Sequence, residues 1–173
     1  MSAASSASRA AVMVPATHRD IDAVARACRK LATRRALISA GASAVPVPGL
    51  DVAVDVSVLV SMIEDINRAF GLTPEQIERL APRRKAFVYR SVMAVGGALV
   101  GRVVTRELVI RVLKTVGVKL TARQAAKAVP FAGQVVAASI GFAALKYLGD
   151  RHIRDCVRVS EALLDADATG SRT

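Results

Sequence analysis

Apolar residues recur with a helical period along almost the whole chain, and no stretch shows the sustained alternation of a β-strand. Aromatic residues make up only 3% of a chain that is 53% hydrophobic, so the core must be built from Ala, Val, Leu and Ile. Such small side chains let helices approach closely. The sequence therefore predicts an all-α fold, a compact multi-helix bundle. One amphipathic stripe, with spacings of three and four, consists of Ile21, Val24, Ala25, Cys28 and Leu31.

Proline and glycine predict where these helices end, because proline lacks a backbone donor and glycine accepts left-handed backbone angles. Two proline-glycine elbows, at residues 44–49 and 128–133, are identical in four of six positions. An internal repeat and chance similarity both explain this match. Thr73 and Gln76 have capping-box spacing and flank Pro74. We expect helices at about residues 17–45, 50–70, 74–81, 83–115 and 134–164, with a short helix starting near Thr121.

The length of 173 residues suits a single domain. Residues 1–16 are rich in Ala and Ser without hydrophobic period, which predicts a disordered arm. Residues 17–165 form the expected helical domain, and residues 166–173 a disordered tail. The residues expected to shape the elbows and helix ends are Pro46, Pro48, Gly49, Asp51, Asp55, Gly71, Pro130 and Gly133.

Positive charge is concentrated in one part of the chain. The net charge is +11, yet residues 36–67 contain no Lys or Arg and residues 128–145 no charged residue. This distribution is typical of proteins that meet anionic surfaces or acidic partners, although a solvated basic face gives the same pattern. The candidate basic patch, interrupted by one acid, Glu107, comprises Arg83, Arg84, Lys85, Arg90, Arg102, Arg106, Arg111, Lys114, Lys119, Arg123 and Lys127.

Few residues are candidates for catalysis or metal binding. Cys28 and Cys156 lie on helical stripes and are interpreted as small core residues. His18 and His152 are interpreted as isolated, without a cluster of ligands at metal spacing. The sequence therefore predicts no catalytic residue, no cofactor and no metal, and the chain is expected not to be an enzyme.

Asp51 and Asp55 are one helical turn apart, which suits either a metal or an acid–base pair. Metal sites normally need three or more converging groups. We therefore favour a structural interpretation, in which Asp51 caps its helix and Asp55 pairs with an Arg of another helix.

The longest uncharged run, residues 128–145, is interrupted by Pro130. The helix after it has about fifteen residues, which extend roughly 22 Å, whereas a membrane core is roughly 30 Å thick. A full membrane span is therefore not favoured, and a hairpin inserted into one leaflet stays an alternative. The start of the chain has no secretory hydrophobic segment, so we expect a cytoplasmic location, peripheral at the membrane.

The run AVPVPGLDVAVD at residues 44–55, followed by Phe70-Gly71-Leu72, resembles the stretch beyond the G domain of immunity-related (interferon-inducible) GTPases. The long stretch 135–164, with Tyr147-Leu148-Gly149-Asp150, resembles the last helix of that family. A related bacterial group, the GTPase-associated domain of unknown function 697, has the same two elbows. The resemblance covers roughly residues 17–164 and implies a helical domain that positions a GTPase, contacts membranes or mediates assembly.

The phosphate-binding pattern Gly-x-x-x-x-Gly-Lys-Ser/Thr occurs nowhere in the chain, so GTP hydrolysis does not carry over from the resemblance. We expect a helical module for peripheral membrane association, for assembly with a separately encoded GTPase, or for both, with self-association as a further expectation. Non-specific nucleic-acid binding is the competing class, suggested by the pI of about 10.8. The shortage of aromatic residues for base stacking counts against it.

Overall fold

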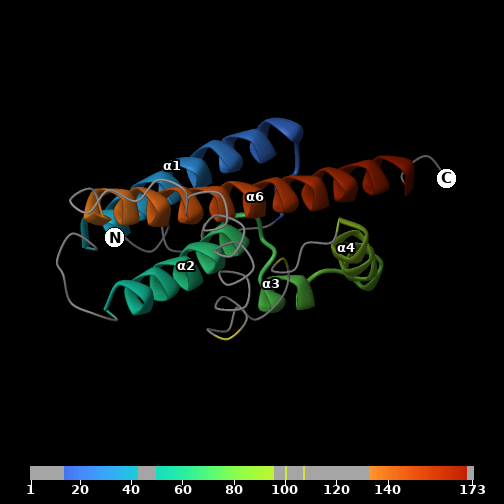
Figure 1. Ribbon diagram of the computed structural model, residues 1–173. Helices are drawn as coiled ribbons and strands as arrows, with labels where there is room; N and C mark the ends of the chain where they lie inside the picture. Colours follow the sequence, from blue (N-terminus) through green and yellow to red (C-terminus); the bar gives the residue numbers. More distant parts are fainter. Residues whose placement is uncertain (1–13, 43–49, 96–99, 101–106, 108–132, 171–173) are drawn as a thin grey trace, which may run out of the picture. The chain divides into compact units, whose positions relative to one another are not determined.

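The computed structural model describes residues 14–42, 50–95, 100, 107 and 133–170. Within these residues every long element is a helix and there is no strand, which confirms the all-α prediction. The helices, labelled in Figure 1, are α1 (His18–Ala42), α2 (Leu50–Ala69), α3 (Pro74–Glu78), α4 (Pro82–Val95) and α6 (Gly133–Gly170).

The first helix begins where the sequence predicts. The backbone N–H of Asp20 donates to Thr17 Oγ1 at 3.1 Å, and the Thr17 hydroxyl donates to the Asp20 carboxylate at 2.7 Å. A threonine that satisfies a free N–H of the first turn is a typical N-cap. The helix is described as far as Ala42. Residues 43–49, which include the elbow residues Pro46, Pro48 and Gly49, lie outside the described residues.

Gly71 ends α2, as predicted. Its φ of 71° lies in the left-handed region, which a residue with a Cβ adopts at a cost. The N–H of Leu72 donates to the carbonyl of Asn67 at 2.8 Å, and the N–H of Gly71 donates to the carbonyl of Arg68 at 3.2 Å. This pair of hydrogen bonds is the Schellman arrangement, which satisfies the last carbonyls of a helix.

The predicted capping box at α3 is also confirmed. The N–H of Gln76 donates to Thr73 Oγ1 at 3.2 Å, and the N–H of Thr73 donates to Gln76 Oε1 at 3.1 Å. The Gln76 amide nitrogen donates in addition to the carbonyl of Arg68 at 3.2 Å. One side chain thus begins α3 and ties it to the end of α2.

Contacts divide the chain into two compact units. Unit 1 consists of Met1–Cys28, Asp65–Val103 and His152–Thr173, and unit 2 of Arg29–Glu64 and Val104–Arg151. Helices α1, α2 and α6 each contribute residues to both units. The single domain expected for residues 17–165 stays a prediction. The apolar core of unit 1 includes Ile21, Ala25, Ile66, Phe70, Ile77, Val88, Ile153 and Val159.

Among its described residues, the core of unit 2 is built from aliphatic side chains and Met62. A Cβ placed on Gly149 of α6 would lie 3.0 Å from the Cβ of Ala32 in α1 and 3.1 Å from Cε of Met62 in α2. A residue with a Cβ at this position would therefore require Ala32 or Met62 to shift by a few tenths of an ångström. The other buried apolar residues in the described part of unit 2 are Ala36, Val56, Leu59, Ile63, Leu145 and Leu148.

The last helix is longer than predicted. It continues to Gly170, so the expected disordered tail is corrected for residues 166–170. The Thr169 hydroxyl donates to the carbonyl of Asp165 at 2.8 Å, and Asp167 pairs with Arg84. These contacts give the polar end of α6 partners that a pattern of apolar residues does not reveal. Residues 1–13 and 171–173 lie outside the described residues.

Several predicted features lie outside what the structure describes. The elbow at Pro130 and the short helix expected near Thr121 belong to this group. The helix expected at residues 83–115 is described as α4 up to Val95. Gly133 is the first residue of α6, and Asp51 and Asp55 lie within α2. The surroundings of the side chains of Asp51 and Asp55 are not described, so their predicted roles stay predictions.

Candidate anion-binding surface

Helix α4 separates an inward face from a basic outward face. It begins with Pro82, which suits the first turn of a helix, and the N–H of Lys85 donates to the carbonyl of Ala81 at 2.9 Å. Val88, Ser91 and Val92 are buried. The helix carries four cations and no acidic residue, all four belonging to the predicted basic patch: Arg83, Arg84, Lys85 and Arg90.

Two of these cations pair with acids of unit 1. Nε of Arg84 donates to both carboxylate oxygens of Asp167 in α6, at 3.1 and 3.3 Å, and its Nη2 pairs with the same carboxylate. This hydrogen bonding holds the pKa of Asp167 below, and that of Arg84 above, its ordinary value. Lys85 Nζ lies 2.5 Å from Glu78 Oε2 of α3. The charges of Arg84 and Lys85 are therefore balanced locally.

Glu78 also accepts a hydrogen bond from the hydroxyl of Tyr89, at 3.1 Å. Hydrogen bonds from Lys85 and then Tyr89 lower the pKa of the Glu78 carboxyl. The hydrogen bond that Tyr89 donates to Glu78 raises the pKa of the Tyr89 hydroxyl. Since Glu78 and Tyr89 are exposed and Lys85 is partly exposed, water screens these interactions and they contribute little to stability. They connect α4 to α3 through the single carboxylate of Glu78.

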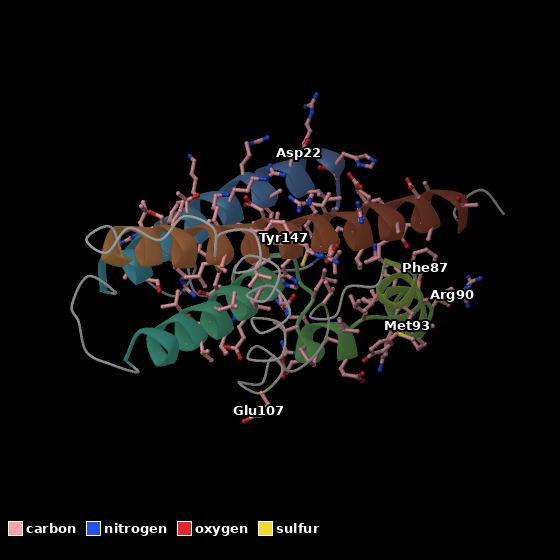
Figure 2. All side chains as sticks on the ribbon, viewed as in Figure 1. Asp22, Phe87, Arg90, Met93, Glu107 and Tyr147 are labelled. Carbon is pink, nitrogen blue, oxygen red and sulfur yellow. The ribbon has the colours of Figure 1, made fainter. Side chains whose placement is uncertain are left out.

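Arg83 and Arg90 remain on the outward face. They are seven residues apart, so they project from the same side of the helix, and both are exposed. The structure records no acidic partner for either among the described residues. Met93 lies three residues beyond Arg90 and is 76% exposed. Figure 2 shows Arg90 and Met93 extending from α4.

The other seven cations of the predicted patch lie outside the described residues, so their arrangement stays a prediction. They are Arg102, Arg106, Arg111, Lys114, Lys119, Arg123 and Lys127. The described part of the patch can attract an anionic surface through two guanidinium groups and place a thioether against it.

The core of unit 1 contains a polar cluster that the sequence interpretation missed. His152 Nε2 lies 2.8 Å from the side-chain oxygen of Asn67. The Cys156 thiol donates to that oxygen at 3.8 Å, and its sulfur lies 3.6 Å from His152 Nε2. All three residues are buried. The interpretation of His152 as isolated was therefore wrong.

Both titratable groups of this cluster are held in their neutral forms. Burial lowers the pKa of His152 to about 4 and raises the pKa of Cys156 well above its ordinary value. An amide oxygen only accepts hydrogen bonds, so His152 Nε2 carries its proton and faces the sulfur as N–H. A nucleophilic cysteine needs a thiolate beside a basic nitrogen. This cluster supplies neither, so its role is to satisfy buried polar atoms.

The cluster had one visible signal in the sequence, because His152 and Cys156 are four residues apart and share a face of α6. Asn67, in an apolar stretch of α2, was the unrecognised partner. The interpretation of Cys28 and Cys156 as core residues is confirmed, since both are free and buried. Burial, followed by the charge of Asp65, raises the pKa of the Cys28 thiol to about 11. The described residues contain no group of three side chains able to hold a metal ion.

No model of a known protein family matches the chain, and no curated protein or solved structure matches it either. The resemblance to the helical domain of immunity-related GTPases therefore stays a prediction from the motifs. None of the described helices is both long enough and apolar enough to cross a membrane.

Proposed function

We propose that this chain is a non-enzymatic helical protein that associates peripherally with anionic membrane surfaces through the outward face of α4. The observation that supports the proposal most directly is the division of the α4 cations. Arg84 and Lys85 are neutralised by Asp167 and Glu78, whereas Arg83 and Arg90 face outward. A helix with two cations that have no acidic partner among the described residues, beside an exposed methionine, matches the composition of interfacial helices.

The strength of such a contact can be estimated. A cation near an anionic membrane contributes about 1 kcal/mol, and this contribution falls within a Debye length of roughly 8 Å at physiological salt. Arg83 and Arg90 together therefore give only weak, salt-sensitive attachment. The cations in residues 101–127 and the apolar side chain of Met93 add to it in this proposal. Reversible binding that high salt releases is the expected behaviour.

Vesicle flotation tests the proposal. The protein should float with vesicles of phosphatidylcholine containing phosphatidylserine, should stay behind with phosphatidylcholine alone, and should be released by high salt. We expect Arg83→Ala/Arg90→Ala to lower the partition coefficient roughly 30-fold, since each cation is worth about 1 kcal/mol. Arg154→Ala/Arg158→Ala removes the same charge from exposed positions of α6 and serves as the matched control. A wild-type protein that floats with neither vesicle contradicts the proposal.

Assembly with a separately encoded GTPase stays a prediction that only the resemblance supports. Adding duplex DNA to the vesicle assay tests nucleic-acid binding by the same surface. If duplex DNA displaces the protein from vesicles and binds it more tightly than they do, the surface serves polyanions in general. That result would replace the membrane proposal.

A further inference from the structure

A second outward face lies on the part of α1 that belongs to unit 2. Ala32, Ala36 and Ser39 are fully buried, which fixes the rotation of this helix segment. Arg35 secures it further, because its guanidinium donates to Ser61 Oγ of α2 at 2.6 Å. The side chains on the opposite side of this segment therefore project away from the buried face.

Two cations and two large aliphatic side chains occupy this outward side. Lys30 and Arg34 are exposed, Leu37 is 59% exposed and Ile38 is 58% exposed. Lys30, Arg34 and Ile38 follow one another at intervals of four residues, and Leu37 is three residues after Arg34. Residues three and four apart are neighbours on a helix, so the four side chains form one surface, termed the α1 face.

We propose that the α1 face is an insertion surface for an anionic lipid bilayer, with Leu37 and Ile38 entering the boundary between headgroups and acyl chains. Lys30 and Arg34 lie beside them at headgroup level. This inference rests on the proposed function and adds a site on the other unit of the chain, independent of α4.

The positive charge of the α1 face favours an anionic bilayer over a second copy of this chain as its partner. The sequence has no acidic residue between Asp22 and Asp51, so nothing along α1 neutralises Lys30 and Arg34. A two-fold contact between two copies places the same surface opposite itself. Lys30 and Arg34 of one copy would then approach those of the other, which is unfavourable. An anionic bilayer instead complements the cations and accepts the aliphatic side chains.

The amphipathic lysine and arginine side chains fit this geometry. Their aliphatic stems can lie along the apolar boundary while the charged ends reach phosphate groups. Leu37 and Ile38 are adjacent in sequence and gain from leaving water. Cations without aliphatic neighbours would only concentrate the protein near the surface, whereas this combination predicts penetration.

The chain contains no tryptophan, so single-tryptophan reporters locate the contact directly. Leu37→Trp places an indole in the α1 face, Met93→Trp places one on α4, and Tyr147→Trp serves as a control at another exposed position, on α6. With vesicles containing phosphatidylserine, the Leu37→Trp protein should show a blue-shifted emission that brominated lipids quench. The Tyr147→Trp protein should not. A shift at position 93 alone would support α4 and overturn the α1 face.

Binding measurements complete the test. Lys30→Ala/Arg34→Ala should lower the partition coefficient roughly 30-fold. Arg154→Ala/Arg158→Ala, with the same spacing and charge loss, should change it less than about threefold, because neighbouring acids of α6 offset those cations. Leu37→Ser/Ile38→Ser should weaken binding and make the remainder fully salt-releasable. Equal losses of vesicle binding in the Lys30→Ala/Arg34→Ala and Arg154→Ala/Arg158→Ala proteins would overturn the proposal.

Two outcomes separate this inference from the proposed role of α4. If Arg83→Ala/Arg90→Ala abolishes flotation and the α1 variants do not, α4 binds the membrane and the α1 face does not. If only the α1 variants lose binding, the α1 face stands and the role of α4 fails. Loss of a dimer in Leu37→Ser/Ile38→Ser, with unchanged vesicle binding, would assign the face to a second copy instead.

Discussion

The two units differ in how their interiors are filled, although α1, α2 and α6 contribute to both. Unit 1 buries a polar cluster, in which Asn67 accepts from His152 and Cys156. In unit 2, Gly149 of α6 instead packs against Ala32 of α1 and Met62 of α2. A buried polar cluster specifies partners by hydrogen bonding, whereas a small-residue contact specifies them by shape. One set of helices thus uses two different means of fixing its neighbours.

The largest effect is expected from removing the acceptor of the polar cluster. Asn67→Ala leaves the N–H of His152 and the Cys156 thiol without their buried acceptor and opens a small cavity. We expect the free energy of unfolding to fall by about 3–4 kcal/mol, measured by urea denaturation. Arg68→Ala, at the exposed neighbouring position, is the control and should cost far less. A loss below about 1 kcal/mol would show that the cluster does not specify unit 1.

Enlarging the glycine of unit 2 tests the other side of the comparison. Gly149→Val places side-chain atoms within contact distances already filled by Ala32 and Met62. Overpacking should destabilise the protein by about 2–3 kcal/mol in thermal or urea unfolding. The matched control is Gly41→Ala, since a Cβ at Gly41 meets nothing within 4 Å. That change should be neutral or stabilise α1 by up to about 1 kcal/mol.

A lower pH should destabilise the interior of unit 1, because that interior contains the buried His152. The pKa of His152 is about 4 when folded and close to 6.5 when unfolded, so the unfolded chain binds the extra proton between these values. Stability should therefore fall by about 2 kcal/mol from pH 7.5 to pH 5, before most carboxylates protonate, and the loss should level off below pH 4. Urea titrations across this range measure it. The His18→Gln protein, changed at the exposed histidine, should show the same dependence.

The smallest of these effects concerns the turn beside the polar cluster. Gly71→Ala forces a residue with a Cβ into positive φ and should cost about 1 kcal/mol. The hydrogen bond from Leu72 to the carbonyl of Asn67 depends on that turn. Gly71→Asn tolerates the left-handed region better and should recover part of the loss in the same denaturation assay. Equal stability of both variants and the wild type would exclude strain at this position.

Local rules explain what the sequence predicted well. The end of α2 at Gly71 and the capping box of Thr73 and Gln76 depend on residues within six positions of one another, so spacing was sufficient. The bond between His152 and Asn67 joins residues 85 positions apart. No local pattern contains that information.

The candidate surface shows the same division. In the sequence the four cations of α4 are equivalent, yet Arg83 and Arg84 are adjacent and have different surroundings. Asp167, which lies 83 positions away, is what neutralises Arg84. Charge density alone does not single out the cations of α1, because it is highest in residues 83–127. Their significance depends on which side of α1 is buried, and burial is a tertiary property.

Because Arg84 pairs with Asp167, the carboxyl-terminal turns of α6 neutralise one positive charge of α4. Proteolytic trimming before Asp167 would remove the carboxylate partner of that guanidinium, so the α4 arginines without an acidic partner among the described residues would rise from two to three. A chain that ends a few residues earlier would then bind anionic surfaces more tightly than the full-length chain. The position of the carboxyl terminus therefore affects how strongly a purified preparation binds such surfaces.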